Sequence, residues 1–152
     1  MDIPMRNTRQ RQTYYGTYNL VTKTGHLKAF SAGNSAHTVE YLQYLQGLYP
    51  GKTLWIFWDN ASYHRSAIIK RYLEQMNKDR DEKNWKILFI PFNPYAPEQN
   101  PMEDLWLKGK NFLRKNAVIN KTFARVKQCF LQFLSTLHCD LNKLNWYFPQ
   151  KN

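Results

Sequence analysis

Two acidic residues stand at the points where apolar and loop-forming sequences meet. Asp59 directly follows the apolar run 54–58 (LWIFW), which lies between Gly51 and Asn60. We interpret this short, aromatic-rich run as a buried parallel strand. Its end lies at the carboxyl edge of the sheet, where open α/β sheets form their ligand crevices. Asp59 is therefore a candidate metal ligand.

The second acid, Glu103, lies in the first turn of a predicted helix. The helix follows a loop that contains three prolines, and it opens with the sequence NPME at residues 100–103. Asparagine at the N-cap and proline at the first helical position are strong start signals. Two interpretations of Glu103 stay open. It is either a metal ligand that points along the crevice toward Asp59, or only the reciprocal partner in a capping box.

Together, the two motifs resemble those of a known family. Residues 59–64 (DNASYH) and 92–106 (FNPYAPEQNPMEDLW) are similar to the acidic motifs of DDE-type transposases from bacterial insertion sequences related to mariner elements. The resemblance extends from about residue 14 to residue 115. It implies a ribonuclease-H-like fold in which Asp59 and Glu103 are the second and third members of a metal-binding acidic triad.

The resemblance also implies metal-dependent DNA cleavage and strand transfer. Both reactions are in-line displacements at phosphorus, which two Mg²⁺ or Mn²⁺ ions promote by activating the nucleophile and neutralising the leaving group. Carboxylates suit these ions because Mg²⁺ prefers oxygen ligands. We expect Asp59 to bridge two ions and Glu103 to bind the second. Asn60 and His64 are candidate accessory residues, although a histidine in the position of His64 is more often a packed or capping side chain.

The first aspartate of the triad has no candidate in this chain. The family carries it on a strand that precedes the hairpin, but the only acid before Glu40 is Asp2, which has no apolar run around it. We therefore expect the sheet to lack its first strand and the isolated chain to be inactive. An upstream-encoded N-terminal transposase segment is the expected source of the missing acid. A decayed remnant of a transposase is the alternative.

The charge of the chain favours a polyanionic partner. Its 22 Lys and Arg against 11 Asp and Glu give a formal net charge of +11, which is typical of nucleic-acid binding. The candidate DNA-binding residues are Arg65, Lys108, Lys110, Arg114 and Lys115. Expected partners are DNA, as transposon ends and target, and a second copy of the complete enzyme in a homodimer. The alternatives are a non-catalytic DNA-binding or interaction module and a nuclease that acts on RNA or hybrids, which the NPME motif disfavours.

The order of predicted elements indicates one α/β domain, a mixed sheet flanked by helices. We divide residues 1–152 into a basic arm (1–12), a family-like core (13–115), and a C-terminal helix with an aromatic tail (116–152). The pattern predicts strands at 13–21, 26–30, 54–58 and 85–90, and helices at 36–49, from residue 60 or 62 to 76, from 101, and at 122–137. Gly16 indicates a bulge or a close backbone approach.

No apolar stretch in the sequence reaches the roughly 18 residues that a membrane helix needs, and the N-terminus lacks the apolar region of a signal peptide. Cys129 and Cys139 form no metal-binding pattern and indicate reduced thiols. We expect a cytoplasmic bacterial protein that is associated with the nucleoid when it is bound to DNA.

Overall fold

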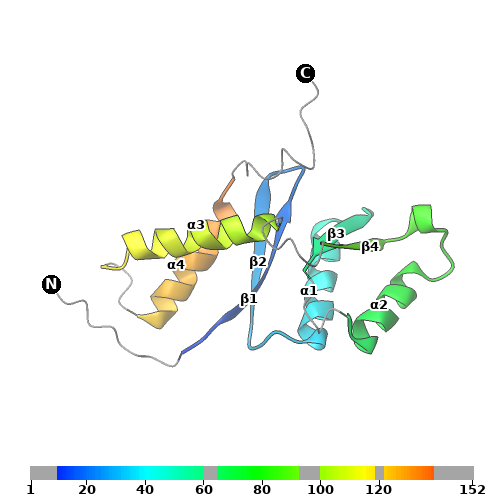
Figure 1. Cartoon of the computed structure of the whole chain (residues 1–152), viewed down its shortest axis with the longest axis horizontal. Coiled ribbons are helices and arrows are strands. Elements are labelled where there is room, and N and C mark those ends of the chain that lie inside the picture. Colours follow the sequence, from blue (N-terminus) through cyan, green and yellow to red (C-terminus); the bar gives the residue numbers. More distant parts are fainter. Residues whose placement is uncertain (1–9, 60–64, 93–99, 119–121, 139–152) are drawn as a thin grey trace, which may run out of the picture.

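A β-hairpin stands at the centre of the fold, with helices on both of its sides (Figure 1). The computed structural model describes residues 10–59, 65–92, 100–118 and 122–138. In chain order the helices and strands are β1 (Thr13–Asn19), β2 (Thr24–Phe30), α1 (Ser35–Leu48), β3 (Leu54–Trp58), α2 (Ala67–Asn77), the short 3₁₀ helix η2 (Glu82–Asn84), β4 (Ile87–Pro91), α3 (Pro101–Lys115) and α4 (Phe123–Thr136). The predicted mixed α/β class is confirmed.

The hairpin pairs β1 with β2 in a regular antiparallel register from Thr13↔Phe30 to Asn19↔Thr24. Its turn, at residues 20–23, lies earlier than residues 22–25, which the predicted strands leave between them. The side-chain oxygen of Asn19 accepts hydrogen bonds from the amides of Val21 and Thr22 at 2.9 and 3.0 Å, and Lys23 adopts a φ of 58°. Because this asparagine-centred turn closes at Lys23, the next two residues are already part of β2.

Helix α1 packs against both pairs of strands. Asn34 caps it by accepting a hydrogen bond from the amide of His37 at 2.8 Å. On its buried face, Tyr41 and Leu45 form one cluster with Phe30 of the hairpin, and Tyr15, Leu54 and Ile56 pack against that cluster. The helix ends just before Pro50, as the sequence predicts. It therefore holds the hairpin and β3 in one core.

The second pair of strands, β3 and β4, is parallel, with Leu54 opposite Ile87 and Trp58 opposite Pro91. The predicted parallel pairing is confirmed, but burial of both faces of β3 is wrong. Trp55 and Phe57 are 66% and 38% exposed. Ile56 points to the other face, where it packs with residues of α1 and α2. In the described residues the strands form two separate two-stranded sheets, β1–β2 and β3–β4.

Helix α2 begins later than its sequence suggests. The predicted starting residues, Asn60 or Ser62, lie outside the described residues. The structure instead uses Ser66, whose hydroxyl oxygen accepts a hydrogen bond from the amide of Ile69 at 3.4 Å. At the other end of α2, the side-chain amide of Asn77 donates to the carbonyl of Ile87 at 2.9 Å. This contact ties the helix to the first residue of β4.

Helices α3 and α4 pack together on the side of the hairpin opposite α1 (Figure 1). Leu27 of β2 forms a buried cluster with Phe130 and Leu134 of α4. Gly109 brings α3 close, because a Cβ atom built there would lie 2.6 Å from the ring of Phe130. The expected aromatic tail, residues 142–152, lies outside the described residues, as does Cys139. In the part of the chain that is described, no helix is long and apolar enough to cross a membrane.

Candidate functional site

Asp59 directly follows the last residue of β3 and is exposed to solvent. The carbonyl of Trp58 accepts a hydrogen bond from the amide of Phe92 at 3.0 Å, so pairing of the two parallel strands continues up to the acid. The ring of Trp58 also stacks on Phe89 with centroids 3.8 Å apart. Backbone and ring contacts therefore fix the position from which the Asp59 side chain extends, at the carboxyl edge of the β3–β4 pair.

Glu103 lies in the first turn of α3 and is also exposed. The side chain of Asn100 caps the helix by accepting a hydrogen bond from the amide of Met102 at 3.0 Å, and the amide of Glu103 donates to the carbonyl of Asn100 at 3.2 Å. No hydrogen bond or ion pair within the described residues involves the Glu103 carboxylate. The reciprocal half of a capping box is therefore not formed there, and the carboxylate faces solvent.

The amino end of α3 is positioned by a close contact with β1. A Cβ atom built on Gly16 would lie 2.8 Å from the Met102 methyl carbon and 2.8 Å from a ring carbon of Trp106. Only glycine permits this approach without displacement. The structure thus has a close approach at Gly16, made by side chains and not by another backbone, and the regular register excludes a bulge. The contact places the turn that carries Glu103 beside the hairpin.

The other predicted site residues divide between described and undescribed parts of the chain. Asn60 and His64 lie outside the described residues. Arg65 is exposed just before α2. Lys108, Lys110, Arg114 and Lys115 are all exposed on α3. Arg114 donates to the side chain of Asn111 at 3.0 Å, and none of the three lysines forms an ion pair with another described residue. These lysines are available to bind an anion.

Two exposed carboxylates on different elements fit a Mg²⁺ ion only in part. Mg²⁺ commonly uses one or two carboxylates and completes its coordination with water and phosphate oxygens. Among the described residues, no three His, Cys, Asp or Glu side chains are grouped so that they could hold a metal ion. Asp59 and Glu103 thus have the right donor chemistry for two ligands, while no other described acid, histidine or cysteine completes a group of three with them.

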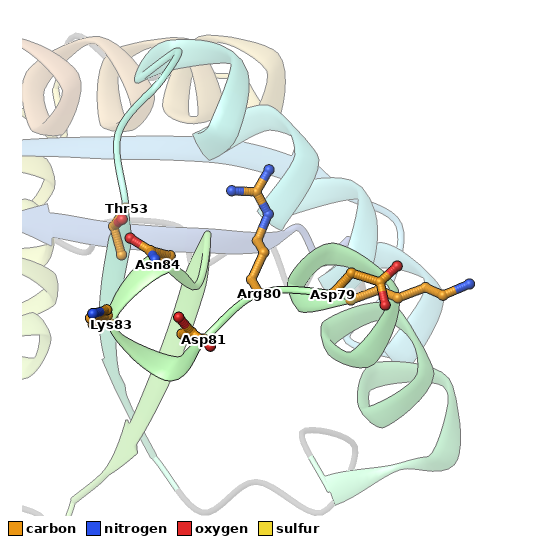
Figure 2. A pocket seen from close by; sticks show the side chains of 7 residues that line it. Thr53, Asp79, Arg80, Asp81, Lys83 and Asn84 are labelled. Carbon is orange, nitrogen blue, oxygen red and sulfur yellow. The ribbon is translucent and has the colours of Figure 1, made fainter.

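A wide polar hollow of about 620 Å³ lies elsewhere, at the amino ends of β3 and β4 (Figure 2). Thr53 lies on one side. The loop after α2 and the helix η2 supply the remaining lining residues, which include both signs of charge: Lys78, Asp79, Arg80, Asp81, Lys83 and Asn84. Asp59 follows the opposite, carboxyl end of β3. The hollow is therefore separate from the acidic site. The sequence indicated this segment only as an exposed charged loop, because mixed charges carry no specific signal for a cavity.

Comparison with known proteins places these observations in a family. The family model of the DDE superfamily endonuclease matches residues 2–124, a range that includes both exposed acids and every element from β1 to α3. A search of curated proteins found no match. The family match covers well over half of the 152 residues, and the mixed α/β architecture agrees with it. The chain belongs to the DDE superfamily endonucleases.

Proposed function

We propose that the chain is the catalytic domain of a transposase that cuts DNA and joins the cut strand to a new site. Asp59 and Glu103 are its metal-binding carboxylates in this proposal. The observation that carries it is the state of Glu103, which lies in the first turn of α3 yet takes no part in the cap. A glutamate needed only for helix initiation would be expected to bond back to the N-cap amide.

Endonucleases of this superfamily generally use divalent metal ions. When bound, Mg²⁺ or Mn²⁺ would supply positive charge at the attacking and leaving oxygens of the phosphate. Asp59 would bind from the end of β3 and Glu103 from the start of α3. Because the two acids belong to separate elements, the contact between Gly16 and Trp106 would help to set the separation between them. We infer two ions in the complete enzyme.

The third carboxylate would come from a segment outside the described residues. The two separate two-stranded sheets support this proposal, because each leaves a strand edge unpaired in the described part of the fold. We propose an upstream-encoded N-terminal segment as the source, with DNA and a second copy of the complete enzyme as the other partners, in the bacterial cytoplasm. Translating the DNA upstream of the Met1 codon in all three frames tests the proposal, and an upstream region without any open frame would overturn it.

Metal binding tests the role of Glu103 directly. Mn²⁺ binding, followed by electron paramagnetic resonance, should weaken at least tenfold in Glu103→Gln, because an amide oxygen carries no charge. Because the Glu103 carboxylate takes no part in the cap, the melting temperature should stay within about 2 °C, given that 1 kcal/mol shifts it by about 2–4 °C in a domain of this size. Glu74→Gln, an exposed glutamate on α2, is the control. Unchanged Mn²⁺ binding in Glu103→Gln would exclude Glu103 as a ligand.

Plasmid nicking tests whether the isolated chain is active. We expect no nicking above background with Mg²⁺ or Mn²⁺, because two carboxylates are an incomplete set. Robust metal-dependent nicking by the chain alone, lost in Asp59→Ala, would show that the isolated chain is active and would overturn this expectation.

A non-catalytic DNA-binding role is the second candidate function. It is favoured by the lack of a three-residue metal cluster within the described residues. This candidate requires no metal binding at Asp59 or Glu103, so it predicts identical Mn²⁺ affinity in wild type and Glu103→Gln. It also predicts DNA binding that is the same with Mg²⁺ as with a chelator.

A further inference from the structure

A groove of about 400 Å³ lies where α3, α4 and the start of β1 meet. Four aromatic residues line it: Tyr14, Trp106, Phe123 and Phe130. Tyr14 and Phe130 lie with ring centroids 5.2 Å apart, and the ring of Trp106 is nearly parallel to that of Phe130, at 9° and 6.1 Å. The planes of Tyr14 and Phe130 are tilted by 44°, so the groove is lined by aromatic rings in more than one plane.

Two lysines flank this aromatic lining, one from each helix. Lys110 lies on α3 and Lys127 on α4, and both line the groove. The ammonium of Lys127 lies 5.1 Å from the ring centroid of Phe123, another lining residue. No described acidic residue lines the groove, and neither lysine forms an ion pair with a described residue. The groove therefore combines an apolar surface with two positive charges that no described acid neutralises.

The groove lies on the same stripe of α3 as the candidate catalytic acid. Glu103, Trp106 and Lys110 are spaced by three and four residues, which places them along one side of the helix. Glu103 and Lys110 are seven residues apart, a rise of about 10 Å along the helix. A strand that approaches Glu103 with a phosphate therefore has a neighbouring nucleotide within reach of the groove.

We propose that this groove binds an unpaired nucleobase of single-stranded DNA, with Lys110 and Lys127 holding the flanking phosphates. A nucleobase has two flat apolar faces that stack on aromatic rings, and the adjacent phosphates match the two ammonium groups. Paired bases within a duplex cannot enter, because their faces are already stacked. The proposal extends the proposed function by naming the form of DNA that this part of the chain takes. Binding needs no metal and no catalysis, so the two ideas can fail separately.

Fluorescence anisotropy in EDTA with a labelled 12-nucleotide single strand, and with the same sequence as a duplex, tests this proposal. Phe123→Leu removes a ring from the rim of the groove but keeps an apolar side chain. We expect it to weaken single-strand binding about tenfold, within the range for loss of one stacking contact, and to leave duplex binding within twofold. Lys110→Ala and Lys127→Ala should each lower the salt slope for the single strand by about 0.7.

Lys108→Ala and Lys115→Ala are matched controls, since both are exposed lysines on α3 that do not line the groove. They should affect single strand and duplex equally. If the groove variants also affect both forms equally, the lysines are only part of a general phosphate-binding surface and the proposal is wrong. It is also wrong if no variant changes single-strand binding while Phe123→Leu abolishes self-association in sedimentation experiments, because the occupant would then be a second copy of the chain.

Discussion

Trp106 of α3 packs so closely against Gly16 of β1 that a Cβ atom on Gly16 would lie 2.8 Å from its ring. We predict that Gly16→Ala lowers the free energy of unfolding by about 1–3 kcal/mol, the usual cost of inserting an atom into a packed contact. The added methyl group requires the side chains of Met102 and Trp106, on either side of Glu103 in α3, to shift. Urea unfolding monitored by circular dichroism measures the change in stability.

Gly47→Ala is the control for this prediction. Gly47 is an exposed residue near the end of α1, and a Cβ atom there would contact nothing within 4 Å. The same substitution should therefore stabilise the chain, by at most about 1 kcal/mol, because alanine has the higher helix propensity. If Gly16→Ala lowers the free energy of unfolding and Gly47→Ala raises it, steric contact at Gly16 is the cause of the loss. A destabilisation of equal size at both would contradict it.

Elements set by short local signals could be predicted from the sequence. Asparagine followed by proline locates the start of α3 at the residues where the structure has it, since both act on the nearest backbone groups. The apolar run of β3 likewise predicts its parallel pairing. Local signals could not predict the burial of β3, because burial depends on which elements cover each face of the strand. Trp55 lies exposed on a face that no described helix covers. The beginning of α2 was also misplaced, since Ser66 competes with two earlier residues of equal capping ability.

In the candidate site, too, local signals predict the positions of residues along the chain but not their contacts in the fold. The positions of Asp59 and Glu103 at the ends of a strand and a helix follow from their neighbours in sequence. Whether Glu103 completes a capping box is set by side-chain geometry, which sequence could not decide. The contact between Gly16 and Trp106 joins residues that lie 90 positions apart, and no single sequence pattern identifies such a pair. The aromatic groove was missed for the same reason, although Lys110 was already a candidate for DNA binding.

A buried tyrosine links the hairpin to α1 and provides the second prediction. The Tyr41 hydroxyl donates to the carbonyl of His26 at 2.8 Å and lies 3.0 Å from the Thr17 hydroxyl. Tyr41→Phe leaves both partners without this bond, so we expect a loss of about 1–3 kcal/mol in the free energy of unfolding. Tyr44→Phe is the matched control, because no described residue bonds to its hydroxyl. Equal losses in the two variants would contradict the role of the hydroxyl.

The same tyrosine predicts a loss of stability in alkali. Burial raises the pKa of Tyr41 far above its ordinary value, because ionisation would place a charge in the core. Above about pH 10 the unfolded chain loses this proton while the folded chain keeps it. The free energy of unfolding should therefore fall as pH rises beyond 10, and less steeply in Tyr41→Phe. Urea midpoints measured from pH 8 to 11 provide the comparison, and parallel curves for the two proteins would refute it.

Salt dependence of DNA binding gives the next prediction. Lys108 and Lys115 form no ion pairs with described residues, so each is free to neutralise a phosphate. The logarithm of the duplex association constant should fall linearly with the logarithm of salt concentration, and the double alanine variant of these two lysines should reduce that slope by up to about 1.8. The charge-conserving control is Lys108→Arg. An unchanged slope in the double variant would place duplex DNA on another face of the chain.

Acid should weaken the fold through His26. Its ring nitrogen Nε2 pairs with the Tyr49 hydroxyl, which also receives a hydrogen bond from the side chain of Asn19 at 2.9 Å. When the imidazole is neutral with its proton on Nδ1, Nε2 can accept the proton of the Tyr49 hydroxyl. Burial also lowers the pKa of His26 below 6.5. Because the unfolded chain then binds a proton at a higher pH than the folded chain, the free energy of unfolding should decrease as pH falls from 7 toward 5.

His26→Gln should reduce this decrease, whereas His138→Gln, at an exposed position, should retain it. If His26→Gln shows the full acid dependence, the loss of stability arises from the carboxylates and not from this histidine.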